Sequence, residues 1–257
     1  MNPGYLIPAS LSLVVVFAVL WGIQVRTKDA SHVDVGWAAG LGFLGVVIAL
    51  SASGLPARRA LVGLMALVWS VRLALHLYFD RVKGKPEDGR YAALRASWGP
   101  RADRNFFFFF QAQAVLDVVL ASSFLAAARR AGPLGLLDWI AVSAWAVSIA
   151  GEAAADRQLA AFRADPANKG KVCRAGLWNW SRHPNYFFEW MIWLSYAAMA
   201  HGAPLAWISP ALMLFFLLRV TGIPATEAQA LKSRGDAYRR YQDEVSMFIP
   251  WPPRRTA

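Results

Sequence analysis

The chain contains few of the side chains that bind metals or form disulfides. It has one cysteine, Cys173, and four scattered histidines in 257 residues. A single thiol cannot form an internal disulfide or a thiolate zinc cluster. The His-Glu-x-x-His pattern of zinc peptidases does not occur either. The sequence therefore gives no indication of a metal centre.

Acidic residues are also scarce relative to basic ones. The sequence contains 16 Asp and Glu against 27 Lys and Arg, a formal net charge of +11. A basic chain can bind nucleic acid, but 57% of the residues are hydrophobic and the mean hydropathy is +0.35. Because basic loops determine the topology of membrane proteins, we predict contacts with membrane lipids and no nucleic-acid partner.

Long apolar runs account for most of the chain. A helix needs roughly 20 apolar residues to cross the hydrocarbon core of a bilayer, and about seven segments are long enough. They are Leu6–Val25, Val33–Ser53, Ala60–Phe79, Phe106–Ala127, Leu134–Ala155, Pro184–Ala200 and Leu205–Gly222. We therefore predict an all-α integral membrane bundle that forms one domain over residues 1–257.

Lysine and arginine are distributed unevenly among the connections between these segments. Alternate connections, together with the C-terminal tail, carry 21 of them, and the other connections carry only four. Cytosolic connections carry such an excess. We predict an external N-terminus, an odd number of spans and a cytosolic C-terminus, in a membrane of the bacterial inner type. In the C-terminal tail, the sequence predicts an amphipathic helix from about Thr226 to Glu244.

Most polar residues inside the predicted spans lie in the cytosolic halves of those spans. Such residues are costly in lipid and indicate a functional site, although each can also pair with another to neutralise a buried charge. Pairing requires no common depth, so we predict a cavity open to the cytosol, with tryptophans that suit a flat apolar ligand. The polar residues are Asp34, Arg72, His76, Tyr78, Gln111, Gln113, Glu152, Asn185, Glu189 and Arg219, with Asp117 nearer mid-span; the tryptophans are Trp37, Trp69, Trp178 and Trp180.

Residues 40–45 (GLGFLG) match the GxGxxG pattern of dinucleotide-binding folds. That pattern has its meaning only between a strand and a helix, and here it lies inside a predicted membrane span. We therefore predict that these small residues allow close packing against a neighbouring helix.

The segment 176–189, GLWNWSRHPNYFFE, carries the most informative set of polar groups. Pro184 suits the first position of a helix, and Asn185 and Glu189 are four residues apart, so they share a helix face. The N–H groups at a helix N-terminus, with Ser181, Arg182 and His183 beside them, form a natural phosphate site. The sequence thus indicates a membrane enzyme that binds a phosphorylated cofactor at the cytosolic surface.

These residues resemble the steroid 5α-reductase superfamily, in particular its bacterial membrane branch. Further patterns carry the resemblance, which covers most of the chain and is more specific in the C-terminal half. They are Gly222-Ile223-Pro224 followed by Glu227, Tyr238–Pro250, Asp88-Gly89-Arg90-Tyr91 and Tyr78-Phe79-Asp80-Arg81. The resemblance implies a seven-helix reductase with four spans over about residues 6–127 and a cofactor-binding half over about 135–257.

The resemblance also implies the reaction and the cofactor. NADPH would deliver hydride to the β-carbon of an enone lipid, with a 3-oxo-Δ4 steroid and its 5α ketone as the expected substrate and product. Asn185 and Glu189 match the family's cofactor-binding pair, and Asp156 matches an acid in the preceding segment. The other cofactor-binding candidates are Ser181, Arg182, His183, Lys171, Arg90, Arg81, Arg219 and Glu152.

The family uses a Glu on the second helix and a Tyr on the third to polarise the substrate carbonyl. Asp34 and Tyr78 occupy those places. Asp in place of Glu shortens the side chain by one C–C bond, so either the substrate or the helix has to shift. Our hypothesis is that a protonated Asp34 and Tyr78 donate hydrogen bonds to the developing enolate oxygen.

Two other functions remain open. The RHPNY element is also similar to the isoprenylcysteine carboxyl methyltransferases, which bind S-adenosylmethionine at a similar cytosolic site. The number of cations favours a multiply phosphorylated cofactor over a sulfonium one. A non-catalytic lipid-binding or scaffold protein would bind no nucleotide. We expect a monomer with a lipid-like small-molecule substrate.

Overall fold

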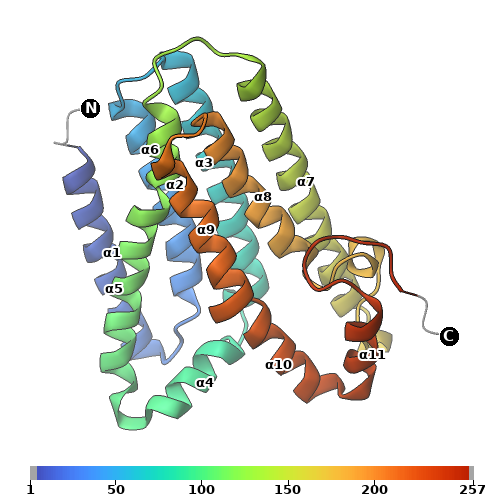
Figure 1. Ribbon diagram of the computed structural model, residues 1–257. Helices are drawn as coiled ribbons and strands as arrows, with labels where there is room; N and C mark the ends of the chain where they lie inside the picture. The colour runs from blue at the N-terminus through green and yellow to red at the C-terminus, as the bar shows by residue number, and fades with distance from the viewer. Residues whose placement is uncertain (1–4, 255–257) are drawn as a thin grey trace. The chain divides into compact units, whose positions relative to one another are not determined.

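The computed structural model describes residues 5–254, and this range is helical without a strand (Figure 1). The chain divides into two compact units. The first unit comprises Met1–Gly135 and Met199–Ser209, and the second comprises Leu136–Ala198 and Pro210–Ala257. Residues 1–4 and 255–257, which the predicted single domain includes, lie outside the described range. The all-α prediction is confirmed for the described residues.

Six helical segments in residues 5–254 are long and apolar enough to cross a membrane. They are Leu6–Thr27, His32–Ser51, Pro56–Val82, Gly89–Ala128, Leu136–Ala164 and Pro204–Arg234. The remaining predicted span, Pro184–Ala200, corresponds to α8 (Pro184–Met199), which has 16 residues. A helix of that length extends about 24 Å, less than the hydrocarbon core of about 30 Å. The prediction of a membrane protein is therefore supported, while the count of seven spans is not confirmed.

From residue 5 onward, the first unit contains six α-helices and one π-helical turn. They are α1 (Leu6–Thr27), α2 (His32–Ser51), α3 (Pro56–Leu77), the π-helical turn Tyr78–Val82, α4 (Gly89–Trp98), α5 (Ala102–Leu120) and α6 (Ser122–Ala128). Short 3₁₀ turns, Gly99–Arg101 and Pro204–Trp207, complete it.

Helices α2 and α3 pack closely because glycines of α2 face small residues of α3. A Cβ on Gly42 would overlap the Ser70 side chain, and a Cβ on Gly45 would overlap the Ala66 methyl group. The Ser70 hydroxyl donates to the Ala38 carbonyl across this contact at 2.7 Å. The prediction that the GLGFLG segment serves helix packing is confirmed.

The predicted fourth span is interrupted where α5 ends and α6 begins. The Ser209 hydroxyl donates to the carbonyl of Leu120 at 2.7 Å and accepts from the amide of Ser123 at 3.3 Å. A side chain inserted into the hydrogen-bond ladder of a helix is a common cause of a break. No local sequence pattern predicts this break, because Ser209 lies far along the chain.

Polar side chains link the helix ends of the first unit. At one end, Lys28 pairs with Asp103 at 2.8 Å, and Arg95 pairs with Glu87 at 2.8 Å. Elsewhere in the unit the buried Arg58 donates to the carbonyls of Arg130, Gly132 and Pro133 at 2.7–3.1 Å. Helix and loop carbonyls without a backbone partner are commonly satisfied by such side chains.

The second unit contains, up to residue 254, four α-helices besides α8. They are α7 (Leu136–Ala164), α9 (Ile208–Phe215) continued by the π-helical turn Phe216–Val220, α10 (Ile223–Arg234) and α11 (Asp236–Glu244), with 3₁₀ turns at Pro166–Asn168 and Gly176–Asn179. The two first residues of α9 belong to the first unit.

Two predicted boundaries in the second unit need correction. Helix α7 continues past the predicted end at Ala155 to Ala164, so Glu152 and Asp156 lie inside a helix and not at the end of one. The predicted helix over Thr226–Glu244 consists of two helices separated by Gly235, whose φ of +50° is a conformation that favours glycine.

Replacement of Gly45 by alanine tests the packing of α2 on α3. The added methyl group would overlap that of Ala66, so the helices have to separate, and we expect a loss of about 1–3 kcal/mol in unfolding free energy. Gly22→Ala in α1 is the matched control, because no atom lies within 4 Å of its added Cβ. Thermal unfolding in detergent should show a lower midpoint only for Gly45→Ala. Equal midpoints would contradict the packing assignment.

Candidate functional site

The candidate residues fall into two groups, one in each unit. The first unit holds Asp34, Tyr78, Arg81 and Arg90. The second unit holds Glu152, Asp156, Lys171, Ser181, Arg182, His183, Asn185, Glu189 and Arg219. The predicted tryptophan-lined wall is divided in the same way, with Trp37 and Trp69 in the first unit and Trp178 and Trp180 in the second.

In the second unit, α7 and α8 bring an amide and three carboxyl groups together. The Asn185 amide donates to Asp156 at 3.3 Å, and Phe188 fills the space beside Gly151, where a Cβ would lie 2.6 Å from its ring. Position 156 thus faces 185 and position 151 faces 188, so the two helices run antiparallel. This register places Glu152 and Glu189 at one level, a turn away from the Asp156–Asn185 pair.

We call Glu152, Asp156, Glu189 and the half-buried Asn185 the buried quartet. The three carboxyl side chains are almost completely buried, and Glu189 accepts from the Trp193 indole at 2.9 Å. Carboxylates are pure hydrogen-bond acceptors, while the Asn amide both donates and accepts. The set suits hydroxyl and amide N–H groups of a ligand. No cluster of three or more His, Cys, Asp or Glu side chains in residues 5–254 is arranged to hold a metal ion.

The polar side chains just before α8 form hydrogen bonds with the C-terminal part of the chain. The Ser181 hydroxyl donates to the Phe248 carbonyl at 2.8 Å and accepts from the His183 amide at 3.1 Å. Arg182 donates through Nη1 to the carbonyls of Gln242 and Val245 at 2.9 and 2.7 Å. These groups fix the start of α8.

Glu227 of α10 is the acceptor that joins these segments. It accepts from Arg182 Nε at 2.7 Å and from Gln242 Nε2 at 2.8 Å. His183 Nε2 lies 3.2 Å from the same carboxylate, and Tyr238 donates to it at 3.5 Å. Burial lowers the pKa of His183, although its hydrogen bond to Glu227 opposes that shift. The histidine is therefore neutral near pH 7 and donates from Nε2.

The predicted phosphate site at the start of α8 is therefore only partly available. Ser181 and His183 are buried and position the helix, and Arg182 is bound to Glu227 and to backbone carbonyls. Lys171 and Arg219 are exposed, and neither side chain has a partner among the described residues. Of the predicted cofactor-binding cations of the second unit, Lys171 and Arg219 are therefore the ones free to meet an anion.

In the first unit, Asp34 is held by arginine and tyrosine side chains. It accepts from Arg81 Nη1 at 3.1 Å, from Arg90 Nη2 at 2.7 Å and from the Tyr91 hydroxyl. Asp88 caps α4 by accepting from the Arg90 amide at 2.9 Å. Burial alone would raise the pKa of Asp88, but the hydrogen bonds and charge of Arg90 outweigh it and lower that pKa.

The oxygens of Asp34 are occupied by three donors, two of them guanidinium groups. The tyrosine that contacts Asp34 is Tyr91, not Tyr78. The catalytic role of Asp34 stays a prediction, and its observed contacts are those of a residue that positions Arg81 and Arg90.

Tyr78 lies apart from this cluster and lines an apolar pocket of about 530 Å³ within the first unit. Its side chain is 41% exposed. The pocket lies along α1 and α2, and its polar groups besides Tyr78 are Ser12 and His32. The other lining residues are Leu13, Val16, Leu20, Val35, Gly36, Ala39, Gly40, Phe43 and Val82. Asp117 is fully buried behind Gly40, whose missing side chain leaves room for the carboxyl group.

Sequence reasoning assigned no role to Tyr91 or Glu227. Both residues belong to short patterns that carry the family resemblance, but their partners lie 57 and 45 residues away in the sequence. The only local signal was composition, since each residue stands in a polar segment between or after the predicted spans. Neither contact is implied by helix periodicity.

Comparisons with known proteins relate the chain to one family and to one fungal protein. A family described as "Protein of unknown function (DUF1295)" matches residues 20–245. An uncharacterized protein of Schizosaccharomyces pombe (strain 972) is 29% identical over 268 residues, which cover 90% of this chain and 76% of that protein. No solved structure matches the chain.

The stability of the protein should decrease in mildly acidic solution because of His183. Burial lowers its pKa in the folded state, so the unfolded chain binds the proton more readily. Stability is therefore lost as the pH falls below about 6.5, the ordinary histidine value. His183→Gln retains an N–H donor but does not titrate in this range. Thermal midpoints at about pH 7.5 and 5.5 should differ less in this variant than in the wild type.

The exposed His201 provides the control for this experiment. His201→Gln should keep the pH dependence of the wild type, because it does not remove the buried imidazole. If His183→Gln and the wild type lose the same stability on acidification, the assignment of His183 as a neutral buried residue is wrong.

Proposed function

Because the chain belongs to the DUF1295 family, and this family is associated with the steroid 5α-reductase-like superfamily, we propose that it is a membrane oxidoreductase. In this proposal it uses NADPH to reduce the C=C bond of an enone lipid, with a 3-oxo-Δ4 steroid as the first substrate to test. Residue contacts in each unit support the proposal.

The observation that carries the proposal is the buried quartet on α7 and α8. Three carboxyl groups and an amide between two apolar helices cost free energy, and polar residues kept in such a place indicate a functional site. Their acceptor oxygens match the ribose hydroxyls and the carboxamide N–H groups of a nicotinamide nucleotide. Asn185 and Glu189 are also the residues that match the family's cofactor-binding pair.

Phosphate groups require cations, and both units contain them. Lys171 and Arg219 are exposed in the second unit. In the first unit, Asp34 and Asp88 orient Arg81 and Arg90. Neither Arg81 Nη2 nor Arg90 Nη1 has a partner among the described residues. An arginine that is held by a carboxylate and retains free N–H groups is well suited to bind phosphate.

The apolar pocket beside Tyr78 is the proposed site of the lipid. Bound NADPH supplies a hydride for the β-carbon of the enone. The electron pair of the C=C bond then moves toward the carbonyl oxygen, and the α-carbon takes a proton. The Tyr78 hydroxyl would donate a hydrogen bond to that oxygen and stabilise the enolate as its negative charge develops.

We also propose the topology that the basic residues predict. The N-terminus would be external and the C-terminus cytosolic, with α8 as a short seventh span. Three of the four arginines on the sparsely charged side are bound to backbone carbonyls. Arg58 contacts the loop after α6, Arg59 contacts the last turn of α2, and Arg130 contacts the Met199 carbonyl. Their structural role explains why they are present on that side despite the charge bias.

Nucleotide binding to the detergent-purified protein tests the proposed cofactor. A ligand at 100 times its Kd stabilises the folded state by about 2.7 kcal/mol, so NADPH should raise the thermal midpoint. Asn185→Ala should abolish this rise. The matched control is Asn168→Ala, because that residue lies beyond the end of α7 and its amide contacts only the Phe162 carbonyl in the last turn of the helix.

Each other outcome of this experiment contradicts the proposal in a defined way. A rise with S-adenosylmethionine alone would assign the protein to a methyltransferase reaction. The absence of a rise with NADPH, NADH or S-adenosylmethionine would favour a non-catalytic lipid-binding protein. A rise with NADH alone would still support a reductase, but it would contradict a site for the 2′-phosphate of NADPH.

Filling the apolar pocket tests where the lipid binds. Ala39 is exposed and lines the pocket, so Ala39→Leu should lower kcat/KM for a 3-oxo-Δ4 steroid by about 10-fold or more. The thermal shift with NADPH should not change. Ala112→Leu, at an exposed position of α5 away from the pocket, is the control. Full turnover in Ala39→Leu would exclude this pocket as the substrate site.

A further inference from the structure

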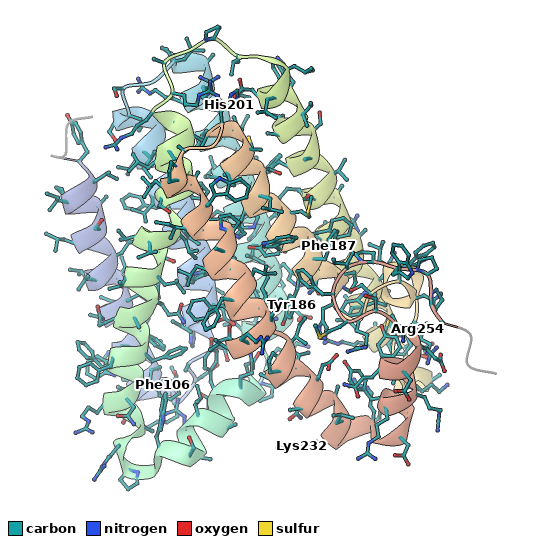
Figure 2. The ribbon with its side chains drawn as sticks, in the orientation of Figure 1. Phe106, Tyr186, Phe187, His201, Lys232 and Arg254 are labelled. Atoms are coloured by element: carbon teal, nitrogen blue, oxygen red, sulfur yellow. The ribbon has the colours of Figure 1, made fainter. Side chains whose placement is uncertain are left out.

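The chain after α11 forms an extended segment that is fixed to the start of α8. The Arg182 amide donates to the Ser246 carbonyl at 2.8 Å, and the Trp251 amide donates to the Trp180 carbonyl at 2.9 Å. Phe248 is buried between these bonds, and its ring lies 5.8 Å from the rings of Phe187 and Trp190. Figure 2 labels Phe187 on α8 and Arg254 in the C-terminal tail.

The outer side of this segment is apolar and exposed. Met247, Ile249 and Trp251 are 41%, 58% and 68% exposed, and the neighbouring Trp180 is 46% exposed. We call these four side chains the tail patch. Backbone hydrogen bonds hold the segment, so its apolar groups cannot turn inward. Contiguous exposed apolar groups on a fixed backbone mark an interaction surface.

The position of the tail patch indicates a lipid partner. Phe248 packs on residues of the first two turns of α8, so the patch lies beside the point at which this apolar helix begins. Tryptophan is enriched at the boundary between the headgroups and the acyl chains. Arg254 follows the patch, is exposed, and its guanidinium has no partner among the described residues. A cation there is complementary to lipid phosphates.

We propose that the tail patch inserts into the headgroup–acyl boundary of the bilayer leaflet in which α8 begins. Amphipathic segments of this kind enter roughly 5–10 Å into that boundary. The insertion would extend the apolar band around α8, which is shorter than the hydrocarbon core, and so reduce the hydrophobic mismatch at this helix. This proposal depends on the membrane location of the chain and not on the proposed reductase activity.

A spin label at position 249 tests the insertion. In a Cys173→Ser background, Ile249→Cys carries a nitroxide, and the full chain is placed in liposomes that contain phosphatidylglycerol and phosphatidylcholine. Power saturation compares the accessibility of the label to oxygen, which concentrates in the bilayer, and to a water-soluble nickel chelate. We expect oxygen to relax the label more strongly than nickel does.

The matched control is Asp236→Cys at the exposed start of α11. Its label should show the opposite order, with stronger relaxation by nickel. A label at 249 that behaves like the label at 236 would overturn the proposal, because the patch would then face water. Shielding from both reagents would also overturn it and would indicate a protein partner or a second copy of this chain.

A second labelled position and one ligand measurement complete the test. If Ile249→Cys does not fold, Met247→Cys reports on the same patch. The label at 247 should also lose oxygen accessibility when Arg254→Gln is combined with liposomes of uncharged lipid. The thermal shift with NADPH should remain in these variants, so a failure of the insertion is distinguishable from a failure of the cofactor assignment.

Discussion

The carboxylate of Glu227 is the group on which the arrangement of the second unit depends. It binds Arg182 and His183 before α8 and Gln242 of α11, and so it holds together segments that are far apart in the sequence. Loss of one partner would leave a buried guanidinium without its counterion, which is a large penalty in a low-dielectric interior. Asn185 lies three residues after Arg182 in the sequence. The register of α8 against α7, and with it the buried quartet, therefore depends on the ion pair between Arg182 and Glu227.

Both units use a carboxylate to fix arginines. Asp34 holds Arg81 and Arg90 in the first unit, as Glu227 holds Arg182 in the second. The consequences differ because the arginines differ in exposure. Arg182 is buried and its contacts are structural, whereas Arg81 and Arg90 remain about one-third exposed and retain free N–H groups. The same interaction therefore stabilises a fold in one place and orients cations toward solvent in the other.

The sequence was sufficient for features that depend on neighbouring residues. Pro184 begins α8 as predicted, and the four-residue spacing of Asn185 and Glu189 places both on the face toward α7. Contacts across long sequence separations could not be predicted in this way. The predicted phosphate ligand Arg182 instead binds carbonyls 60 and 63 residues away, and Asp34 binds the hydroxyl of Tyr91, to which no role was assigned. Helix periodicity carries no information about such partners.

The hydroxyl of Ser209 closes the junction between α5 and α6, although it lies beyond α7 and α8 in the chain. During synthesis, the first unit therefore cannot complete this junction when its own helices have emerged. It waits until two more helices have been made and inserted. In chains of this size, domains generally fold in the order in which they are synthesised. Here the order of biosynthesis and the order of completion differ, which couples the maturation of the first unit to that of the second.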